Sequence, residues 1–232
     1  MTDTAPSAVP ALDLDPFTPE NLADPFSHHA GLRDAGPLIW LPALGCYAMA
    51  RYGEVQAALM DWETFISGRG VGLTDFARET PWRPPSLLLE MDPPTHNRTR
   101  GIMKKIVTLA ALREVMPEWR EKADALVGSV AGKGPIDAIP DLAEALPLSI
   151  FPDMIGIREE GRENLIPYAT VAFNAFGPRN ALLAEAMEAA KDATEWVNES
   201  CKRDNLQPGG WGMQLYEAAD RGECSADEAE RL

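Results

Sequence analysis

His96 and Arg100 are the residues whose type and spacing most clearly suggest chemistry, and they lie in the stretch DPPTHNRTR. Asp92 followed by two prolines is typical of a helix start, so the four-residue spacing predicts that both side chains share one face of the first helical turns. An imidazole and a guanidinium beside the positive end of a helix suit a pair of carboxylates. The same spacing also fits a solvated helix start whose His and Arg bind only water, and this alternative stays open.

Basic side chains continue beyond this motif. Between Pro93 and Arg113 the chain has five Lys or Arg residues and no Asp or Glu, although its net charge is −15. These five are Arg98, Arg100, Lys104, Lys105 and Arg113. A local patch of one sign can steer an acidic protein partner or an anionic ligand. A solvated helix face is the competing interpretation.

A second candidate site lies in WRPPSLLL, where Arg83 and Ser86 are three residues apart and three leucines follow. A guanidinium and a hydroxyl beside an apolar wall suit an amphipathic acid, although an arginine next to proline in a loop is commonly just solvated. Phe173 and Phe176 in FNAFG form a third pair near an expected helix end. Core packing explains the spacing of the two phenylalanines equally well.

Composition limits the classes of function. The chain has 232 residues, 45% of them hydrophobic and 25% charged, which is typical of a globular protein with a sizeable core. No apolar run approaches the roughly 18 residues of a membrane span, and the first residues lack the features of a targeting signal, so we expect a cytoplasmic protein without membrane contact. The acidic net charge argues against nucleic-acid binding. Three cysteines without a metal-binding spacing predict reduced thiols and no metal site, and no established catalytic motif is present.

The elements that must position these residues are mostly helical. Residues 1–22 are rich in Pro, Ala and Asp and predict an extended arm, with one domain in residues 23–232. Ser225 and Glu228 form a capping box that opens a helix. The pattern predicts a mainly α fold with a small β portion, made of a short helix after Asp24, a hairpin in 37–50, a helix in 52–61, a long Pro- and Gly-rich loop, at least two helices in 95–131, and helices in 141–157, 159–176 and 181–203.

This order of elements, together with DPPTHNRTR, resembles the N-terminal half of a cytochrome P450, a haem-thiolate monooxygenase. Further stretches are similar to the bacterial class that oxidises para-substituted benzoic acids. They are RGVGLTDF, PWRPPSLLLEMDPPTH, IDAIPDLAEALPLSIFPDMIG, EGRENLIPYATVAFNAFGP and the NLxPGG loop. The resemblance implies part of the cytochrome P450 fold, haem b as the cofactor, and insertion of one oxygen atom from O₂ by oxidative demethylation or hydroxylation.

The resemblance also assigns roles to individual residues. His96 and Arg100 fall at the positions that bind the haem propionates. The electron donor that it implies is a [2Fe-2S] ferredoxin, docking on the basic patch of Arg98, Lys104, Lys105 and Arg113. The implied contacts to an aromatic carboxylic acid substrate are a carboxylate clamp of Arg83 and Ser86, an apolar wall including Leu89, and ring contacts from Phe173 and Phe176.

The chain departs from the family pattern in one essential respect. The family's iron ligand is a cysteine in an FxxGxHxCxG loop, and neither this loop nor the ExxR motif nor the oxygen-activating acid–alcohol pair is present. Cys46, Cys201 and Cys224 lie in none of the required contexts, so none is assigned as the ligand. We therefore expect an N-terminal fragment that is inactive alone. The alternative is a shortened, non-catalytic relative that acts as a binding or interaction module.

Overall fold

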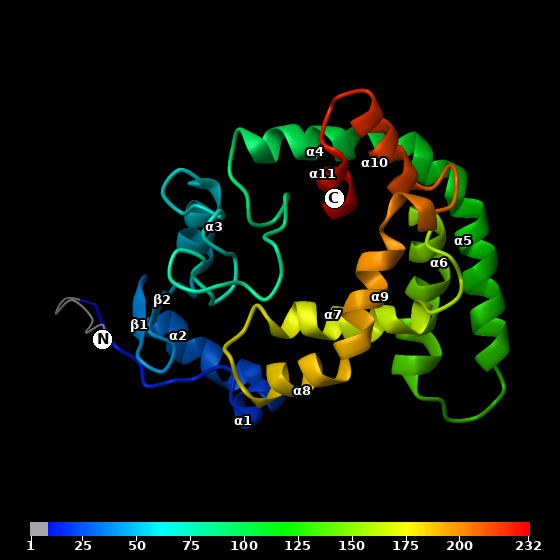
Figure 1. The fold of residues 1–232 in the computed structure, drawn as a ribbon. Coiled ribbons are helices and arrows are strands. Elements are labelled where there is room, and N and C mark those ends of the chain that lie inside the picture. Colours follow the sequence, from blue (N-terminus) through cyan, green and yellow to red (C-terminus); the bar gives the residue numbers. More distant parts are fainter. Residues whose placement is uncertain (1–8) are drawn as a thin grey trace. The chain divides into compact units, whose positions relative to one another are not determined.

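The computed structural model describes residues 9–232, and helices account for most of its regular structure (Figure 1). Its one sheet in this range has two strands, which confirms the predicted mainly α class. No helix among residues 9–232 is long and apolar enough to cross a membrane. The helices are α1 (Pro19–Ala23), α2 (His29–Ala35), α3 (Tyr52–Met60), α4 (Thr95–Ile106), α5 (Leu109–Val130), α6 (Ala145–Ile155), α7 (Leu165–Asn174), α8 (Ala181–Ala189), α9 (Lys191–Ser200), α10 (Trp211–Asp220) and α11 (Ala226–Arg231).

Contacts divide the described chain into two compact units. The first contains residues 9–82 and Ala175–Arg179, and the second contains Arg83–Asn174 and Asn180–Leu232. The predicted clamp and the DPPTHNRTR motif both belong to the second unit. Each unit is described separately.

The first unit is built around the predicted hairpin. Strands β1 (Ile39–Leu41) and β2 (Cys46–Ala48) are antiparallel, and β1 is buried along its whole length. Trp40 lies opposite Tyr47, with ring centroids 4.9 Å apart in an edge-on arrangement that favours aromatic pairs. Gly45 has a φ of 61°, a conformation that glycine adopts without steric cost and that closes the turn.

Part of the expected N-terminal arm packs onto this hairpin. Trp40 N donates to Pro10 O at 2.9 Å, and Leu12 N donates to Trp40 O at 3.0 Å, as in a short parallel bridge. Thr18 then caps α1 through its side chain. Residues 9–23 therefore have defined hydrogen bonds, while residues 1–8 of the predicted arm lie outside the described residues.

In the second unit, α4 provides the surface on which α10 packs, and α11 follows α10 beside it (Figure 1). Thr99, Ile102 and Ile106 are buried and recur at three- to four-residue steps, which is the inward face of a helix. Leu215 and Tyr216 of α10 join the two isoleucines in one apolar cluster. This cluster fixes α4, which carries His96, Arg100 and three of the four residues of the predicted redox-partner patch.

The start of one helix agrees with its sequence prediction, and two other helices differ from theirs. The predicted capping box is confirmed, because Ser225 Oγ accepts from Glu228 N at 3.1 Å and Glu228 Oε2 accepts from Ser225 N at 2.9 Å. The helix expected in 181–203 is instead divided at Ala190 into α8 and α9. The helix expected in 141–157 begins as a wider π-helical segment, Ile139–Glu144, before α6.

Candidate functional site

His96 and Arg100 lie in the first two turns of α4. At about 100° per residue they are only about 40° apart around the helix axis, on a side different from the buried face. Pro94 provides no side-chain cap, and the first turn contains no acidic residue, so nothing on the helix itself neutralises its positive end. Among residues 9–232, the side chain of Arg100 has no hydrogen bond or ion pair, and His96 Nδ1 lies 3.4 Å from Asn97 Oδ1.

This donor set fits the acidic edge of a haem. An imidazole and a guanidinium on one helix face, next to a positive helix end, offer hydrogen bonds to two propionate groups. His96 is half-buried and Arg100 is exposed, so both are within reach of a ligand. The residues of α4 therefore suit the propionates, but they offer no ligand for the iron.

The loop from Arg83 to Glu90 brings the predicted clamp residues together. Arg83 Nη1 is 3.0 Å from Glu90 Oε2, and Ser86 N donates to the same oxygen at 2.7 Å. Ser86 Oγ accepts from the backbone N–H groups of Leu88 and Leu89 at 3.2 and 3.1 Å. Arg83 and Ser86 thus share one partner, the carboxylate of Glu90. Sequence spacing did not identify this residue.

Thr99 connects this loop to α4. Its side chain is completely buried, and Oγ1 donates to Leu87 O at 2.7 Å. From the other side of the loop, Arg231 Nη2 of α11 donates to Pro85 O at 2.8 Å. The clamp loop is therefore held by hydrogen bonds from two helices, and neither contact was predicted from the sequence.

The remaining predicted substrate contacts are exposed or belong to the other unit. Leu89 is 54% exposed and Phe173, at the end of α7, is 75% exposed. Phe176 belongs to the first unit, where its carbonyl accepts from Leu73 N at 3.0 Å. A Cβ atom on Gly72 would be 2.8 Å from Phe176 Cα, so only glycine permits this close approach.

The predicted redox-partner patch separates into two pairs of residues. Arg98 forms a two-pronged ion pair with Glu228 of α11, and Lys105 Nζ is 2.6 Å from Glu223 Oε2. We call these two ion pairs the C-terminal clasp. Lys104 and Arg113 are exposed, and within residues 9–232 neither has an ion pair.

Electrostatics agree with the geometry of the C-terminal clasp. The hydrogen bond to Glu228 raises the pKa of Arg98, and in return it lowers the pKa of the Glu228 carboxyl, helped by the backbone N–H of Ser225. Hydrogen bonds from Lys105 and then Arg221 lower the pKa of Glu223. Both glutamates are therefore held in the charged form.

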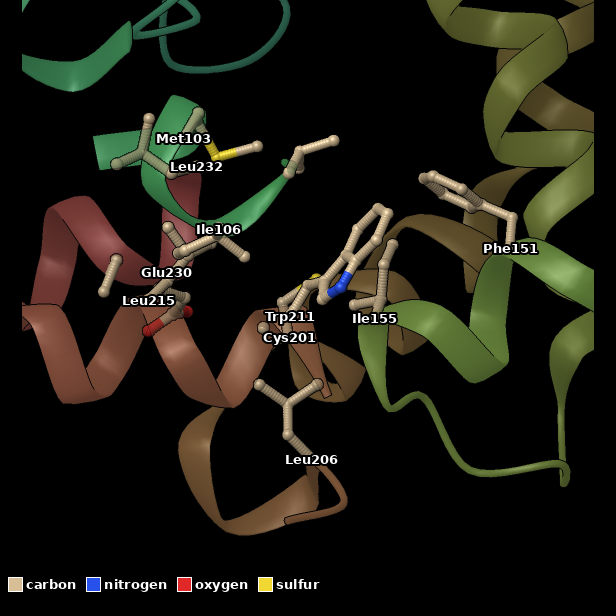
Figure 2. A pocket seen from close by; sticks show the side chains of 13 residues that line it. Met103, Ile106, Phe151, Ile155, Cys201, Leu206, Trp211, Leu215, Glu230 and Leu232 are labelled. Carbon is tan, nitrogen blue, oxygen red and sulfur yellow. The ribbon is translucent and has the colours of Figure 1, made fainter. Parts of the chain in front are cut away.

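The second unit also contains an apolar cavity of about 390 Å³ between α4, α6, α10 and α11. Figure 2 shows Met103, Trp211 and Ile155 among the side chains that line it. Glu230 is the one acidic residue of the lining, and Cys201 supplies a thiol. None of the predicted haem- or substrate-binding residues lines this cavity, so it is separate from the clamp and from the His96–Arg100 face.

The environment of each cysteine opposes thiolate formation. Burial raises the pKa of the thiols of Cys46, Cys201 and Cys224, and nearby carboxylates add to this effect at the last two. A haem-thiolate iron needs the deprotonated sulfur. Among residues 9–232 there is also no group of three or more His, Cys, Asp or Glu side chains that could hold a metal ion.

Known proteins provide an independent comparison. The chain is 48% identical over 227 residues to cytochrome p450 CYP199A2 of Rhodopseudomonas palustris, which covers 97% of this chain and 55% of that protein. It is 29% identical to nocardicin C N-oxygenase of Nocardia uniformis subsp. tsuyamanensis, covering 71% of this chain and 41% of the relative. The chain thus spans about half the length of these relatives. No family model matches it.

Solved structures agree on the fold. The haem domain of CYP116B5 from Acinetobacter radioresistens superposes with a TM-score of 0.75 at 19% identity, covering 94% of this chain and 56% of that one. P450BioI in complex with an acyl carrier protein carrying hexadec-9Z-enoic acid gives a TM-score of 0.70 at 23% identity, covering 92% and 57%. With the sequence match to CYP199A2, these likenesses show that the chain belongs to the cytochrome P450 family, as an N-terminal portion of its fold.

Proposed function

We propose that this chain is part of a haem-dependent monooxygenase that oxidises para-substituted benzoic acids, by oxidative demethylation or hydroxylation. The observation that supports this substrate class best is the Arg83–Glu90 loop. It places a guanidinium and a hydroxyl, both suited to a carboxylate, directly before the helix that carries His96 and Arg100. Thr99 thus joins the loop of the proposed carboxylate clamp to the helix of the proposed propionate contacts.

Each residue has a distinct role in this proposal. Arg83 and Ser86 bind the carboxylate of the aromatic acid and so orient its para-substituent away from the loop. The hydroxyl of Ser86 accepts two backbone hydrogen bonds, which leaves its own hydrogen for an acid oxygen. Leu89 and Phe173, which belong to the same unit as the clamp, are proposed to contact the ring.

His96 and Arg100 would hold the haem by its two propionates. When bound, haem supplies the activation of O₂, with one oxygen atom going to the substrate and the other to water as two electrons and two protons are taken up. The electrons are proposed to come from a [2Fe-2S] ferredoxin. Its docking contacts would fall on the exposed Lys104 and Arg113 more than on Arg98 and Lys105, which are already paired.

The clamp is tested by replacing Arg83 with alanine in the full-length, haem-loaded protein. Loss of a charge-assisted hydrogen bond predicts acid binding weaker by at least about 1.5 kcal/mol, or more than about tenfold. Isothermal titration calorimetry with para-methoxybenzoate measures this affinity. Because the substitution also leaves Glu90 without its ion-pair partner, para-methoxybenzamide serves as the matched neutral ligand. Equal losses for the acid and the amide, or unchanged acid affinity, would count against the proposed substrate class.

The haem contacts are tested separately. His96→Ala and Arg100→Ala each remove one propionate donor, so haem retention after gel filtration should fall in both variants. Arg120→Ala, which removes an exposed cation of α5 away from this helix face, is the control. Normal haem content in both variants would remove the proposed roles of His96 and Arg100.

A further inference from the structure

Glu90 is the buried acid of the clamp loop. Glu90 is only 6% exposed, although Leu88 is half-buried and Leu89 is exposed. The backbone turn explains this placement, because Glu90 N donates to Ser86 O at 3.2 Å and so folds the chain back on itself. A buried carboxylate is unfavourable unless donors surround it, which is the case for Glu90.

The donors to Glu90 are the clamp residues themselves. Arg83 Nη1 and Ser86 N donate to Oε2 at 3.0 and 2.7 Å, and Arg83 Nη2 lies 3.4 Å from Oε1. A carboxylate with two oxygens that binds both nitrogens of a guanidinium fixes the plane of that group. Glu90 therefore determines where the guanidinium of Arg83 lies relative to Ser86.

The surroundings make this arrangement rigid. Thr99 holds the carbonyl of Leu87, and Arg231 holds the carbonyl of Pro85, so the backbone of the loop is fixed on both sides of Ser86. The positive charge of Arg83 also reaches Tyr168 of α7, where it partly opposes the burial that raises the pKa of the phenol. The long side chain of Arg83 is held in turn by Pro84 O, to which Nη1 donates at 2.9 Å, and by the carboxylate of Glu90, which contacts both of its terminal nitrogens.

We propose that Glu90 is the positioning residue of the acid clamp, holding Arg83 and Ser86 in the geometry that binds a substrate carboxylate without itself touching the substrate. This inference rests on the proposed function. A positioning role and a purely electrostatic role of Glu90 predict opposite changes in acid affinity. Replacing Glu90 makes the loop more positive, so charge alone predicts tighter acid binding, whereas loss of position predicts weaker acid binding.

The experiment compares two ligands in the full-length, haem-loaded protein. Isothermal titration calorimetry measures para-methoxybenzoate and para-methoxybenzamide in the wild type, Glu90→Gln and Glu90→Asp. We expect Glu90→Gln to weaken the acid at least about tenfold and to change the amide by less than about twofold. Glu90→Asp keeps the charge on a shorter stem, so its acid affinity should fall between the other two. If Glu90→Gln does not fold, the acid and amide affinities of Glu90→Asp are compared with those of the wild type instead.

Glu79→Gln is the matched control, since it removes another glutamate ion pair, with Arg179, from outside the loop. Tighter acid binding in Glu90→Gln would show that Glu90 competes with the substrate, and equal losses for acid and amide would show a merely structural role. Either outcome overturns the inference. If the wild type does not bind the acid more tightly than the amide, the proposed function and the inference are both overturned. If the wild type prefers the acid and both Glu90 variants keep that preference, only the inference is overturned.

Discussion

Thr99 shows how a single buried hydroxyl joins two parts of the site. It is fully buried and donates to Leu87 O at 2.7 Å, so the substitution Thr99→Val keeps the shape of the side chain but leaves that carbonyl without this donor. We expect the free energy of unfolding to fall by about 1–3 kcal/mol, the usual cost of an unsatisfied buried polar group. Urea denaturation followed by circular dichroism measures the change.

Thr170→Val is the matched control, because the exposed hydroxyl of Thr170 bonds only to a carbonyl of its own helix, α7. Water replaces that bond when it is lost, so the control should change stability by less than about 0.5 kcal/mol. Hydrogen exchange of residues 86–90 should increase in Thr99→Val alone. Equal stability of the two variants would contradict the role given to Thr99.

Local spacing predicted which side chains of the candidate site share a turn or a helix face, but not their partners. Arg83 with Ser86 and His96 with Arg100 are three or four residues apart, and short spacing within a turn or helix determines which side chains can meet. Glu90 and Thr99 escaped prediction because their contacts depend on how the loop folds back on α4. The identity of the buried partner therefore depends on tertiary packing, although a glutamate following three leucines was a signal that a charge enters an apolar environment.

The C-terminal clasp gives α4 and α11 a pH-dependent attachment. The pKa values of Glu223 and Glu228 are lowered in the folded protein, from an ordinary value of 4.5. The stabilisation from these ion pairs is therefore fully present above the ordinary value, and it is lost as the pH falls through the lowered values. We expect the hydrogen-exchange protection factors of α11 to decrease below about pH 4.5, more steeply than those of α8, which has no part in the clasp.

Glu228→Gln provides the control for this pH dependence. The amide cannot titrate, so the additional acid-induced loss of protection in α11 should shrink in the variant. High salt should weaken the effect in the wild type, because the basic partner of each ion pair is exposed to solvent. An identical pH profile in the wild type and the variant would show that Glu228 does not hold α11.

Adjacent lysines on α4 allow a direct test of which cations serve a protein partner. Both lysines are exposed, but Lys105 is paired with Glu223, whereas Lys104, about 100° around the helix, has no ion pair within residues 9–232. Lys104→Gln should weaken binding of an acidic [2Fe-2S] ferredoxin up to about fivefold, as expected for loss of one surface ion pair. Lys105→Gln should affect binding less and α11 stability more. Surface plasmon resonance at two salt concentrations measures the affinities, and a larger loss in Lys105→Gln would contradict the assignment.

Helix prediction succeeded where either a capping motif or an apolar period was present. Ser225 and Glu228 predicted the start of α11, and the apolar spacing in 95–131 predicted α4 and α5. No helix was predicted for α10, because its first turn, which includes Gly212, directly follows the loop-like residues Pro208, Gly209 and Gly210. A Cβ atom at Gly212 would lie 2.9 Å from Leu206 Cδ1 and 3.1 Å from Ile155 O, so close packing favours glycine at this position. Close packing at the helix start thus places a residue typical of loops inside a helix.

At the scale of the molecule, each unit combines buried apolar side chains with exposed ones. In the first unit, Tyr52, Leu59 and Met60 of α3 are each at least 75% exposed, so this helix has an uncovered apolar face. The second unit has a continuous core from α4 to α11 and an apolar cavity beside it. Large exposed apolar faces are typical of surfaces that another part of a protein or a partner covers. The amount of covered surface was not predictable from composition, which is ordinary for a globular protein.

The carbon-monoxide difference spectrum tests what these 232 residues achieve without further polypeptide. Their three thiols are biased towards the protonated form by burial, and a thiolate is needed for the electron donation that favours O–O cleavage in this family. We therefore expect the chain, reconstituted with haem and reduced under carbon monoxide, to show no thiolate-type absorbance, while the full-length protein shows it. Haem retention by wild-type chain but not by Arg100→Ala would show that the propionate contacts act without the iron ligand. A thiolate-type spectrum from the 232 residues alone, abolished by replacing one of Cys46, Cys201 or Cys224 with serine, would identify that cysteine as the ligand and contradict this expectation.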